Sequence, residues 1–477
     1  MRNALFPFAA RWASALILML ASLAPWLLPG RASAQTESTV LVRDAEIERL
    51  LRTLTTPLFR TAGVDPALVR ISLIQARAIN AFVTTGNRLF IHTGLIQQSG
   101  SVGELVGVLA HETGHIAGGH VARLPEEMRN AMIRSVAGML LGGAVAAAGG
   151  RNVGGNPGAA ILSGPALAQQ ELLAFTRAQE QAADQAGITY LARLGWPADG
   201  LLQLLGKLRE QEALVTARQD PYLRTHPLSR DRMDFVATVV ARRPGGGAAG
   251  GFPPEFEPAF RMAKAKLDGF IDPPLTTWRR YPDSDASAPA RYARAVAQYR
   301  TGRADSALAL LDPLLQEQPG NPWLRELQGQ ILFEAGRPEA ALAPLREAVR
   351  LAPNEPLLRT LYGRALMEAG GTARLQAAVT EFEWSLRAER DSGFTWRQLG
   401  TAHGRLGQLP QADLALAEEA MLDGDYPRAR FLARRAEEAL PPGALKLRAQ
   451  DLRFAAQRDN LTREQRDQDD AMRRRPR

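Results

Sequence analysis

The sequence lacks cysteine entirely: none occurs among its 477 residues. This absence excludes disulfide bonds, and it also excludes lipid attachment to an N-terminal cysteine after processing. Stability therefore has to come from hydrophobic cores and from any metal ion that the chain binds. Histidine is scarce as well, with six in the whole chain, so two histidines at a meaningful spacing are seldom a coincidence.

A large excess of charge is also missing. The 58 basic and 50 acidic residues give a formal net charge of +8, which is small for this length. Nucleic-acid-binding domains concentrate far more basic residues, so we do not expect a nucleic-acid partner. The basic run Arg473-Arg474-Arg475-Pro476-Arg477 ends the charged tail that we predict over residues 456–477. Such a tail is solvated, and it can add peripheral attraction to an anionic membrane.

Long apolar runs are missing except at the N-terminus. There, Arg2 and Arg11 precede an apolar run over residues 12–28, and Ala32 and Ala34 form an A-x-A cleavage site. We predict a signal peptide over residues 1–34, cut after Ala34, with an uncleaved membrane anchor as the alternative.

Residues 135–150 also carry no charge, but this stretch is too short and too rich in glycine for a membrane span. We expect it to form a buried helix or a lid near an active site. A membrane-embedded peptidase is therefore disfavoured.

The next part of the chain predicts an α+β domain that is mainly helical. Helices are predicted over residues 41–62, 101–122 and 168–194. Alternating apolar residues and a Thr-Gly-Asn turn predict strands between residues 68 and 96. The segment 243–254 is rich in glycine and proline, which is typical of a linker. We place the first domain at residues 35–242 and a linker and joining region at 243–288.

The rest of the chain contains a repeat. Three residue types keep a period of 34 residues: Gly302, Gly336 and Gly370; Ala307 and Ala341; and Pro319 and Pro353. This is the period of the tetratricopeptide (TPR) helix-turn-helix, so we predict an all-α TPR solenoid over residues 289–455. A helical bundle with coincidental spacing is the alternative. A solenoid of this kind presents a concave groove for protein substrates or partners.

One motif points to chemistry. Residues 111–115 read His-Glu-Thr-Gly-His, and apolar residues on either side indicate a helix. Residues four apart share one face of a helix, so His111 and His115 can bind one ion. Zinc suits neutral imidazole ligands, and Glu112 can act as general base on a water that the metal activates. The pattern therefore predicts a zinc hydrolase site.

Such a site needs a third protein ligand. His120 is close in sequence, but on a continuous helix it would point away from His111 and His115, so we interpret it as a structural or hydrogen-bonding residue. Glu180 on the later helix is the better candidate, because a carboxylate can complete a two-histidine site. Asp184 lies one turn further and can accept a hydrogen bond from a ligand histidine.

These residues resemble a known family. The run from Glu104 to His115, followed by Glu180-x-x-Ala183-Asp184, is similar to the gluzincin peptidases that include HtpX and the CAAX prenyl proteases. Asn80-Ala81-Phe82 and Thr93-Gly94-Leu95 resemble the strand segment that precedes the metal helix in that group. A signal peptide and C-terminal repeats narrow the resemblance to the BepA-like periplasmic metalloproteases.

The resemblance implies a gluzincin domain with a small β-sheet, followed by the TPR solenoid. It also implies a periplasmic zinc metalloendopeptidase with His111, His115 and Glu180 as ligands and Glu112 as base. The implied role is quality control of unassembled outer-membrane proteins, with chaperone behaviour and contact with the assembly machinery through the repeats. The rival function is a chaperone or assembly adaptor with a latent metal site.

Two further residues have open roles. His226-Pro227 and Arg232 resemble the later H-P-x-x-x-x-R element of the group. As catalytic residues they would stabilise the tetrahedral oxyanion. Alternatively, His226 occupies the open zinc position and keeps the enzyme latent, or both residues are structural. We also expect the strand over residues 88–92 to pair with an extended substrate.

Overall fold

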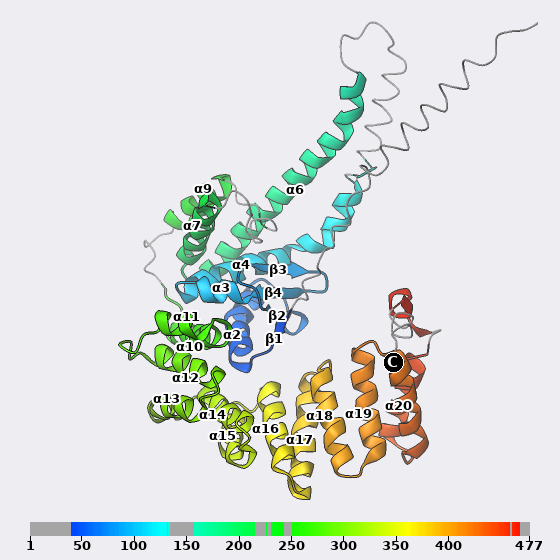
Figure 1. The fold of residues 1–477 in the computed structure, drawn as a ribbon. Coiled ribbons are helices and arrows are strands. Elements are labelled where there is room, and N and C mark those ends of the chain that lie inside the picture. The colour runs from blue at the N-terminus through cyan, green and yellow to red at the C-terminus, as the bar shows by residue number, and fades with distance from the viewer. Residues whose placement is uncertain are drawn as a thin grey trace, which may run out of the picture. The chain divides into compact units, whose positions relative to one another are not determined.

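The computed structural model describes residues 40–130, 132–133, 157–214, 226, 230–242, 250–457 and 460–467. The predicted signal peptide, the uncharged stretch 135–150 and the end of the charged tail lie outside the described residues. The described part is mainly helical with one four-stranded sheet, which confirms the predicted α+β, mainly α fold class (Figure 1). None of its helices is both long enough and apolar enough to cross a membrane.

The sheet forms from the segment that alternates in sequence. Its strands are β1 (Leu41–Val42), β2 (Arg70–Ile74), β3 (Ala81–Thr84) and β4 (Arg88–His92), in the order β1-β2-β4-β3. Strands β2 and β4 are parallel, and the other neighbours are antiparallel. The β3–β4 hairpin turns through Gly86 and Asn87, which both have positive φ, as a tight hairpin turn requires.

The position of β4 corrects one expectation. We expected residues 88–92 to pair with substrate, but β4 has a strand on each side and its backbone is already engaged. The edges of the sheet are β1 and β3, and β3 is the edge that contacts helix α4 (Val102–Gly118). The hairpin pattern in the sequence could not show which of its two strands lies at the sheet edge, because β2 pairs in parallel with β4, and these strands are not consecutive in the chain.

Helices cover the sheet and build the first core. After α2 (Ala45–Thr61) and the short 3₁₀ helix Pro66–Leu68 come α3 (Thr93–Gln98), α4, α6 (Pro157–Arg193), α7 (Asp199–Leu214) and α9 (Arg230–Ala241). The first fifteen residues of α4 are all buried, which matches its apolar sequence. Leu105, Val108 and Leu109 from α4 pack in one cluster with Leu51 and Leu54 from α2. Helix α4 thus lies at the centre of the first core.

Two further helices fill the predicted joining region. They are α10 (Phe256–Ile271) and α11 (Pro274–Arg280). Phe256 and Phe260 of α10 belong to the same hydrophobic cluster as α2 and α4. Helix α10 therefore packs as part of the N-terminal core, although it follows the glycine-rich linker in sequence.

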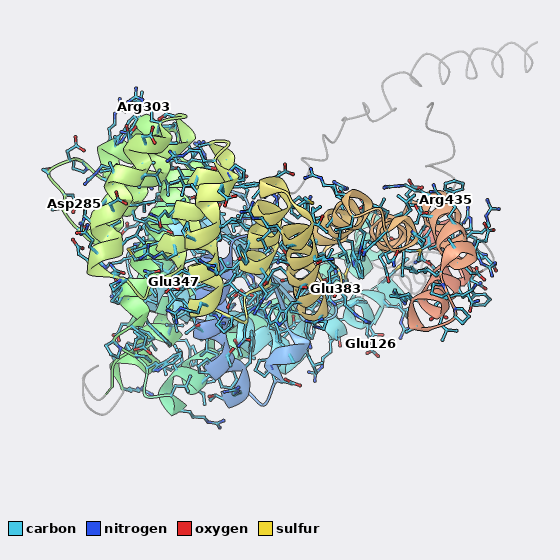
Figure 2. The ribbon with its side chains drawn as sticks, turned by 90° about the horizontal axis from the view of Figure 1, so that it is seen from below. Glu126, Asp285, Arg303, Glu347, Glu383 and Arg435 are labelled. Carbon is cyan, nitrogen blue, oxygen red and sulfur yellow. The ribbon has the colours of Figure 1, made fainter. Side chains whose placement is uncertain are left out.

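Five helix pairs follow, and each stacks on the next (Figure 1). They are α12 (Ala288–Arg300) with α13 (Ala304–Glu317), α14 (Pro322–Glu334) with α15 (Pro338–Leu351), α16 (Pro356–Ala369) with α17 (Thr372–Ala388), α18 (Gly393–Arg405) with α19 (Leu409–Leu422), and α20 (Tyr426–Ala439) with α21 (Ala444–Ala455). Gly302 and Gly336 turn the chain between the helices of a pair, with φ of 77° and 73°. Charged side chains such as Arg303 in a turn, and Glu383 and Arg435 on helices, are exposed in this region (Figure 2).

A buried cluster joins the first core to the repeats. Lys266 of α10 is 1% exposed, and its Nζ lies 2.8 Å from Asp44 Oδ2 and 3.0 Å from Glu326 Oε2. The hydroxyl of Tyr292 donates to Glu46 at 2.9 Å. These contacts link α2 and α10 to α12 and α14. Removing one partner of such a buried ion pair costs much more than losing a surface pair.

Candidate metal centre

Helix α4 places the residues of the His-Glu-x-x-His motif. His111 and His115 are four residues apart, so they project from one face of the helix. His111 and Glu112 are fully buried, and His115 is 7% exposed. The helix ends at Gly118, because Gly119 adopts a left-handed conformation with φ of 62°.

Helix α6 brings the two carboxylates to this face. The helices approach closely at two glycines: a Cβ atom on Gly114 would lie 2.7 Å from the carbonyl oxygen of Ala183. One on Gly187 would lie 2.9 Å from the carbonyl carbon of Ala110. Only glycine permits this approach, and it puts Glu180 against the histidines of α4.

The three predicted ligands converge in the structure. The Nε2 atoms of His111 and His115 are 3.1 Å apart. Glu180 Oε2 lies 3.5 Å from His111 Nε2, and Glu180 Oε1 lies 3.3 Å from His115 Nε2. Four atoms from three side chains thus face one another in a buried site, where their lone pairs would repel unless a cation or a proton lay between them.

His226 completes the group. Its Nδ1 atom lies 3.1 Å from Glu180 Oε1 and 3.4 Å from His111 Nε2. The ligand atoms of all four residues lie within 4.8 Å of one another. Sequence patterns did not decide between the roles of His226, because no local period relates it to α4 or α6.

These distances fit a zinc ion. Zinc binds nitrogen and oxygen at about 2.0–2.1 Å, so the ligand atoms of a tetrahedral site are roughly 3.3–3.4 Å apart. The separations among His111, His115 and Glu180 are 3.1, 3.3 and 3.5 Å, on both sides of that value. Two or three imidazoles with one carboxylate are also a donor set that zinc prefers. The residues present therefore suit the metal that the sequence predicts.

Asp184 and Arg232 support the ligands. Asp184 Oδ1 accepts a hydrogen bond from His111 Nδ1 at 2.8 Å. Arg232 donates from Nε to Asp184 Oδ2 at 2.8 Å, and its Nη1 lies 2.8 Å from Glu180 Oε2. The guanidinium is buried and engages both carboxylates. The sequence left open whether Arg232 stabilises an oxyanion or is structural, and in the structure its guanidinium binds Glu180 and Asp184.

Without a metal, the pKa values of the two histidines of α4 are shifted in opposite directions. Burial lowers the pKa of His111, but the Asp184 and Glu180 carboxylates outweigh it and raise this pKa to about 10. Burial lowers the pKa of His115 to about 3, and the positive charge of His111 adds to the effect. His111 therefore favours the protonated form, with a proton on each ring nitrogen, and metal binding has to displace the proton on Nε2.

Glu112 stands apart from this network. Complete burial raises the pKa of its carboxyl group, which nearby His226 and His111 only partly counter. Within the described residues, neither of its oxygens has a hydrogen-bond partner. His226 Nε2 is nearby, at 3.4 Å from Glu112 Oε1. A buried carboxylate of this kind is available to exchange a proton with a water molecule in the site.

His120 contacts the outer side of the site. Its Nδ1 lies 2.9 Å from His115 Nδ1, and it is 9% exposed. On a continuous helix it would point elsewhere, but the left-handed Gly119 ends α4 and redirects the chain. The glycine in sequence was the available signal for this break.

The chain matches two family models. Residues 42–240 match the model described as peptidase family M48, and residues 280–322, 292–356 and 326–391 match the model described as tetratricopeptide repeat.

Curated relatives show a similar combination. The chain is 29% identical over 303 residues to the beta-barrel assembly-enhancing protease of Yersinia pestis, covering 62% of this chain and 60% of that protein. It is 28% identical over 304 residues to the Escherichia coli K12 protein of the same name, with the same coverage. It is 24% identical over 201 residues to the metalloprotease LoiP of Escherichia coli K12, covering 42% of this chain and 73% of that protein. The chain thus spans less than two thirds of the length of the first two relatives.

Proposed function

We propose that this chain, which carries a peptidase family M48 domain over residues 42–240 followed by tetratricopeptide repeats, is a zinc-dependent endopeptidase. The observation that supports this most directly is the convergence of His111, His115 and Glu180 beside the buried carboxylate of Glu112. A structural role alone does not explain why a buried carboxylate that accepts no hydrogen bond from the described residues lies next to three potential metal ligands.

In this proposal His111, His115 and Glu180 hold the zinc ion. Zinc, when bound, supplies a Lewis acid that polarises a carbonyl group and increases the acidity of water. Glu112 takes a proton from the attacking water and passes it to the leaving nitrogen. Asp184 fixes the tautomer of His111 through Nδ1, and Arg232 holds Glu180 and Asp184 in place.

The sheet provides a place for substrate. Strand β3 lies at an edge of the sheet and contacts α4. A substrate strand that pairs with the free edge of β3 would therefore lie beside the helix that carries His111 and His115. We infer that an extended substrate segment pairs with β3, because an edge strand offers unpaired N–H and C=O groups. Folded proteins cannot present such a segment, so unfolded or unassembled chains are the preferred substrates.

His226 makes the described state latent in this proposal. Its Nδ1 atom lies beside Glu180 Oε1 and His111 Nε2, so it could serve as a fourth ligand, whereas a catalytic site needs an open position for water or substrate. Activity would then require His226 to leave. The proximity of His226 Nε2 to Glu112 supports the same interpretation, since the imidazole also stands beside the proposed base.

The biological setting follows from the relatives and the sequence. Two relatives are named for enhancing beta-barrel assembly, so we propose that this chain degrades misfolded or unassembled outer-membrane proteins in the periplasm. Its parts would be a signal peptide over residues 1–34, the peptidase domain over 35–242, a joining region over 243–288, the repeats over 289–455 and a charged tail over 456–477. The repeats would hold substrates or assembly partners, and the tail would favour peripheral membrane association.

Hydrolysis of a denatured test protein tests the activity. We expect cleavage that a chelator abolishes and added zinc restores. Glu112→Gln should lower the rate by about 10²- to 10⁴-fold, the usual contribution of a general base, while zinc content stays at one ion per chain. Glu126→Gln, an exposed glutamate beyond α4 (Figure 2), is the matched control and should cleave normally. Cleavage by Glu112→Gln at the wild-type rate would refute the assignment of the base.

A further inference from the structure

The two ligand histidines of α4 are supported in different ways. His111 has a carboxylate partner, because Asp184 Oδ1 lies 2.8 Å from its Nδ1. The Nδ1 atom of His115 instead faces Nδ1 of His120 at 2.9 Å. The partner of His115 is therefore another imidazole, and no motif or comparison assigns a role to it.

The tautomers of this pair follow from the geometry. His115 Nε2 faces His111 Nε2 and Glu180 Oε1, so it must keep its lone pair free if it is to bind a metal. The proton of neutral His115 then resides on Nδ1 and points to His120. Since two nitrogens at this distance need one donor and one acceptor, His120 Nδ1 is the acceptor and its own proton lies on Nε2.

The local backbone is arranged for this contact. Gly119, with φ of 62°, ends α4 so that His120 does not continue along the helix. The His120 ring folds back over Gly118, where a Cβ atom would lie 2.4 Å from His120 Nε2. Any side chain on Gly118 would therefore displace the ring. Two consecutive glycines thus make room for one buried imidazole behind the second histidine of the motif.

We infer that His120 is a positioning residue, which accepts the Nδ1–H of His115 and so fixes the orientation in which His115 offers Nε2 to the metal. This inference rests on the proposed zinc function. It gives the site two supports of different chemistry, a carboxylate behind His111 and a neutral imidazole behind His115. Partners of this kind fix the tautomer and the ring orientation of a metal-bound histidine.

Zinc affinity, measured by competition with a chromophoric chelator, tests the inference directly. His120→Phe keeps the size of the ring and removes the acceptor, so it should weaken zinc binding by about 10- to 100-fold. His120→Asn keeps an acceptor oxygen and should restore affinity to within a few-fold of wild type. His403→Phe, in the repeats, removes another buried histidine and should leave zinc affinity unchanged.

Gly118→Ala gives an independent variant that keeps both histidines. Its methyl group should push the His120 ring away from His115 and lower zinc affinity as His120→Phe does, although alanine favours the helix. The melting temperature of the metal-free protein should stay close to wild type in these variants, while the increase caused by zinc becomes smaller. Cobalt substitution adds a spectroscopic readout, since a reoriented His115 should shift the visible absorption bands.

The outcomes separate the inference from the function on which it rests. Wild-type zinc affinity in His120→Phe, or an equal loss in His120→Phe and His120→Asn, would overturn the positioning role and leave the peptidase intact. A wild-type chain that binds no zinc would overturn the proposed function itself. A loss of stability in the metal-free His120→Phe chain, with an unchanged increase on zinc addition, would identify His120 as a packing residue and also overturn the inference.

Discussion

The guanidinium of Arg232 lies 2.8 Å from Glu180 through Nη1, so the carboxylate that faces the two histidines is also bound to a buried cation. A second carboxylate, Asp184, shares the same guanidinium. Arginine is suited to this position because its planar group can serve both acids at once. The centre is therefore a charge network in which each member holds another in place.

Replacing Arg232 by methionine should destabilise the metal-free protein strongly. The change leaves Glu180 and Asp184 buried without their cation, which typically costs about 3–5 kcal/mol. Zinc should restore part of this loss, because the ion supplies positive charge to Glu180. Urea unfolding with and without zinc measures both effects, and Arg230→Met, an exposed neighbour, is the control. Equal stability of Arg232→Met and wild type without metal would contradict the network.

Replacing His226 by alanine should raise the basal rate of proteolysis several-fold. The three proposed ligands His111, His115 and Glu180 would remain, so zinc content should not change, while the fourth position becomes open. The measurement is the initial rate on a denatured protein at fixed zinc, with His403→Ala as control. A fall of tenfold or more with zinc retained would instead indicate that His226 takes part in the reaction.

Replacing Gly114 by alanine should separate α4 from α6. The added methyl group would lie 2.7 Å from the carbonyl oxygen of Ala183, so the helices must move apart and carry Glu180 away from the histidines. We expect a loss of about 1–3 kcal/mol in stability, as for overpacked cores, together with weaker zinc binding. Gly206→Ala in α7 has open space around the new methyl group and should be neutral or slightly stabilising. Similar behaviour of the two variants in unfolding and zinc titration would argue against the close crossing.

The cluster around Lys266 should make stability depend on pH. Burial raises the pKa of Glu46 to about 7, although Lys266 opposes the shift. A glutamate in an unfolded chain has a pKa near 4.5. Between pH 4.5 and 7 the folded protein therefore holds a proton on Glu46 that the unfolded chain has released. Stability due to Glu46 is therefore greatest below pH 4.5 and falls as pH rises towards 7, by at most about 1.4 kcal/mol per unit.

Glu46→Gln tests this dependence. The amide can still accept from Tyr292 but does not ionise, so the variant should gain stability relative to wild type as pH rises from 5 to 8. Urea unfolding across this range at fixed zinc measures the difference. Glu383→Gln changes an exposed glutamate (Figure 2) and should run parallel to wild type. A gap between Glu46→Gln and wild type that stays constant with pH would count against the raised pKa.

Local patterns predicted the parts of the site that depend on one helix. The spacing of His111 and His115 is a property of α4 itself, and the 34-residue period predicted the repeats, which the family comparison confirms. Glu180 could be proposed from its place after the motif. The approach that joins it to the histidines depends on Gly114 and Gly187, and no local pattern shows which glycines lie at a helix crossing.

The rest depended on tertiary structure. His226 reaches the centre from a separate part of the chain, so its place beside Glu180 has no signature in spacing. The contact between His120 and His115 arises because Gly119 interrupts the helix. A prediction based on a continuous helix instead pointed His120 away from His115. The parallel pairing of β2 with β4 likewise moved the available sheet edge from β4 to β3.

Helix α10 has a practical consequence for dissecting the protein. The glycine-rich linker suggests ending an N-terminal fragment near residue 242. Phe256 and Phe260, which follow the linker, nevertheless pack in the core with α2 and α4. A fragment that stops at the linker would lack these two side chains, which would expose apolar core surface and favour aggregation. A fragment of the N-terminal domain made for crystallisation should therefore extend through α11 and end near Arg280.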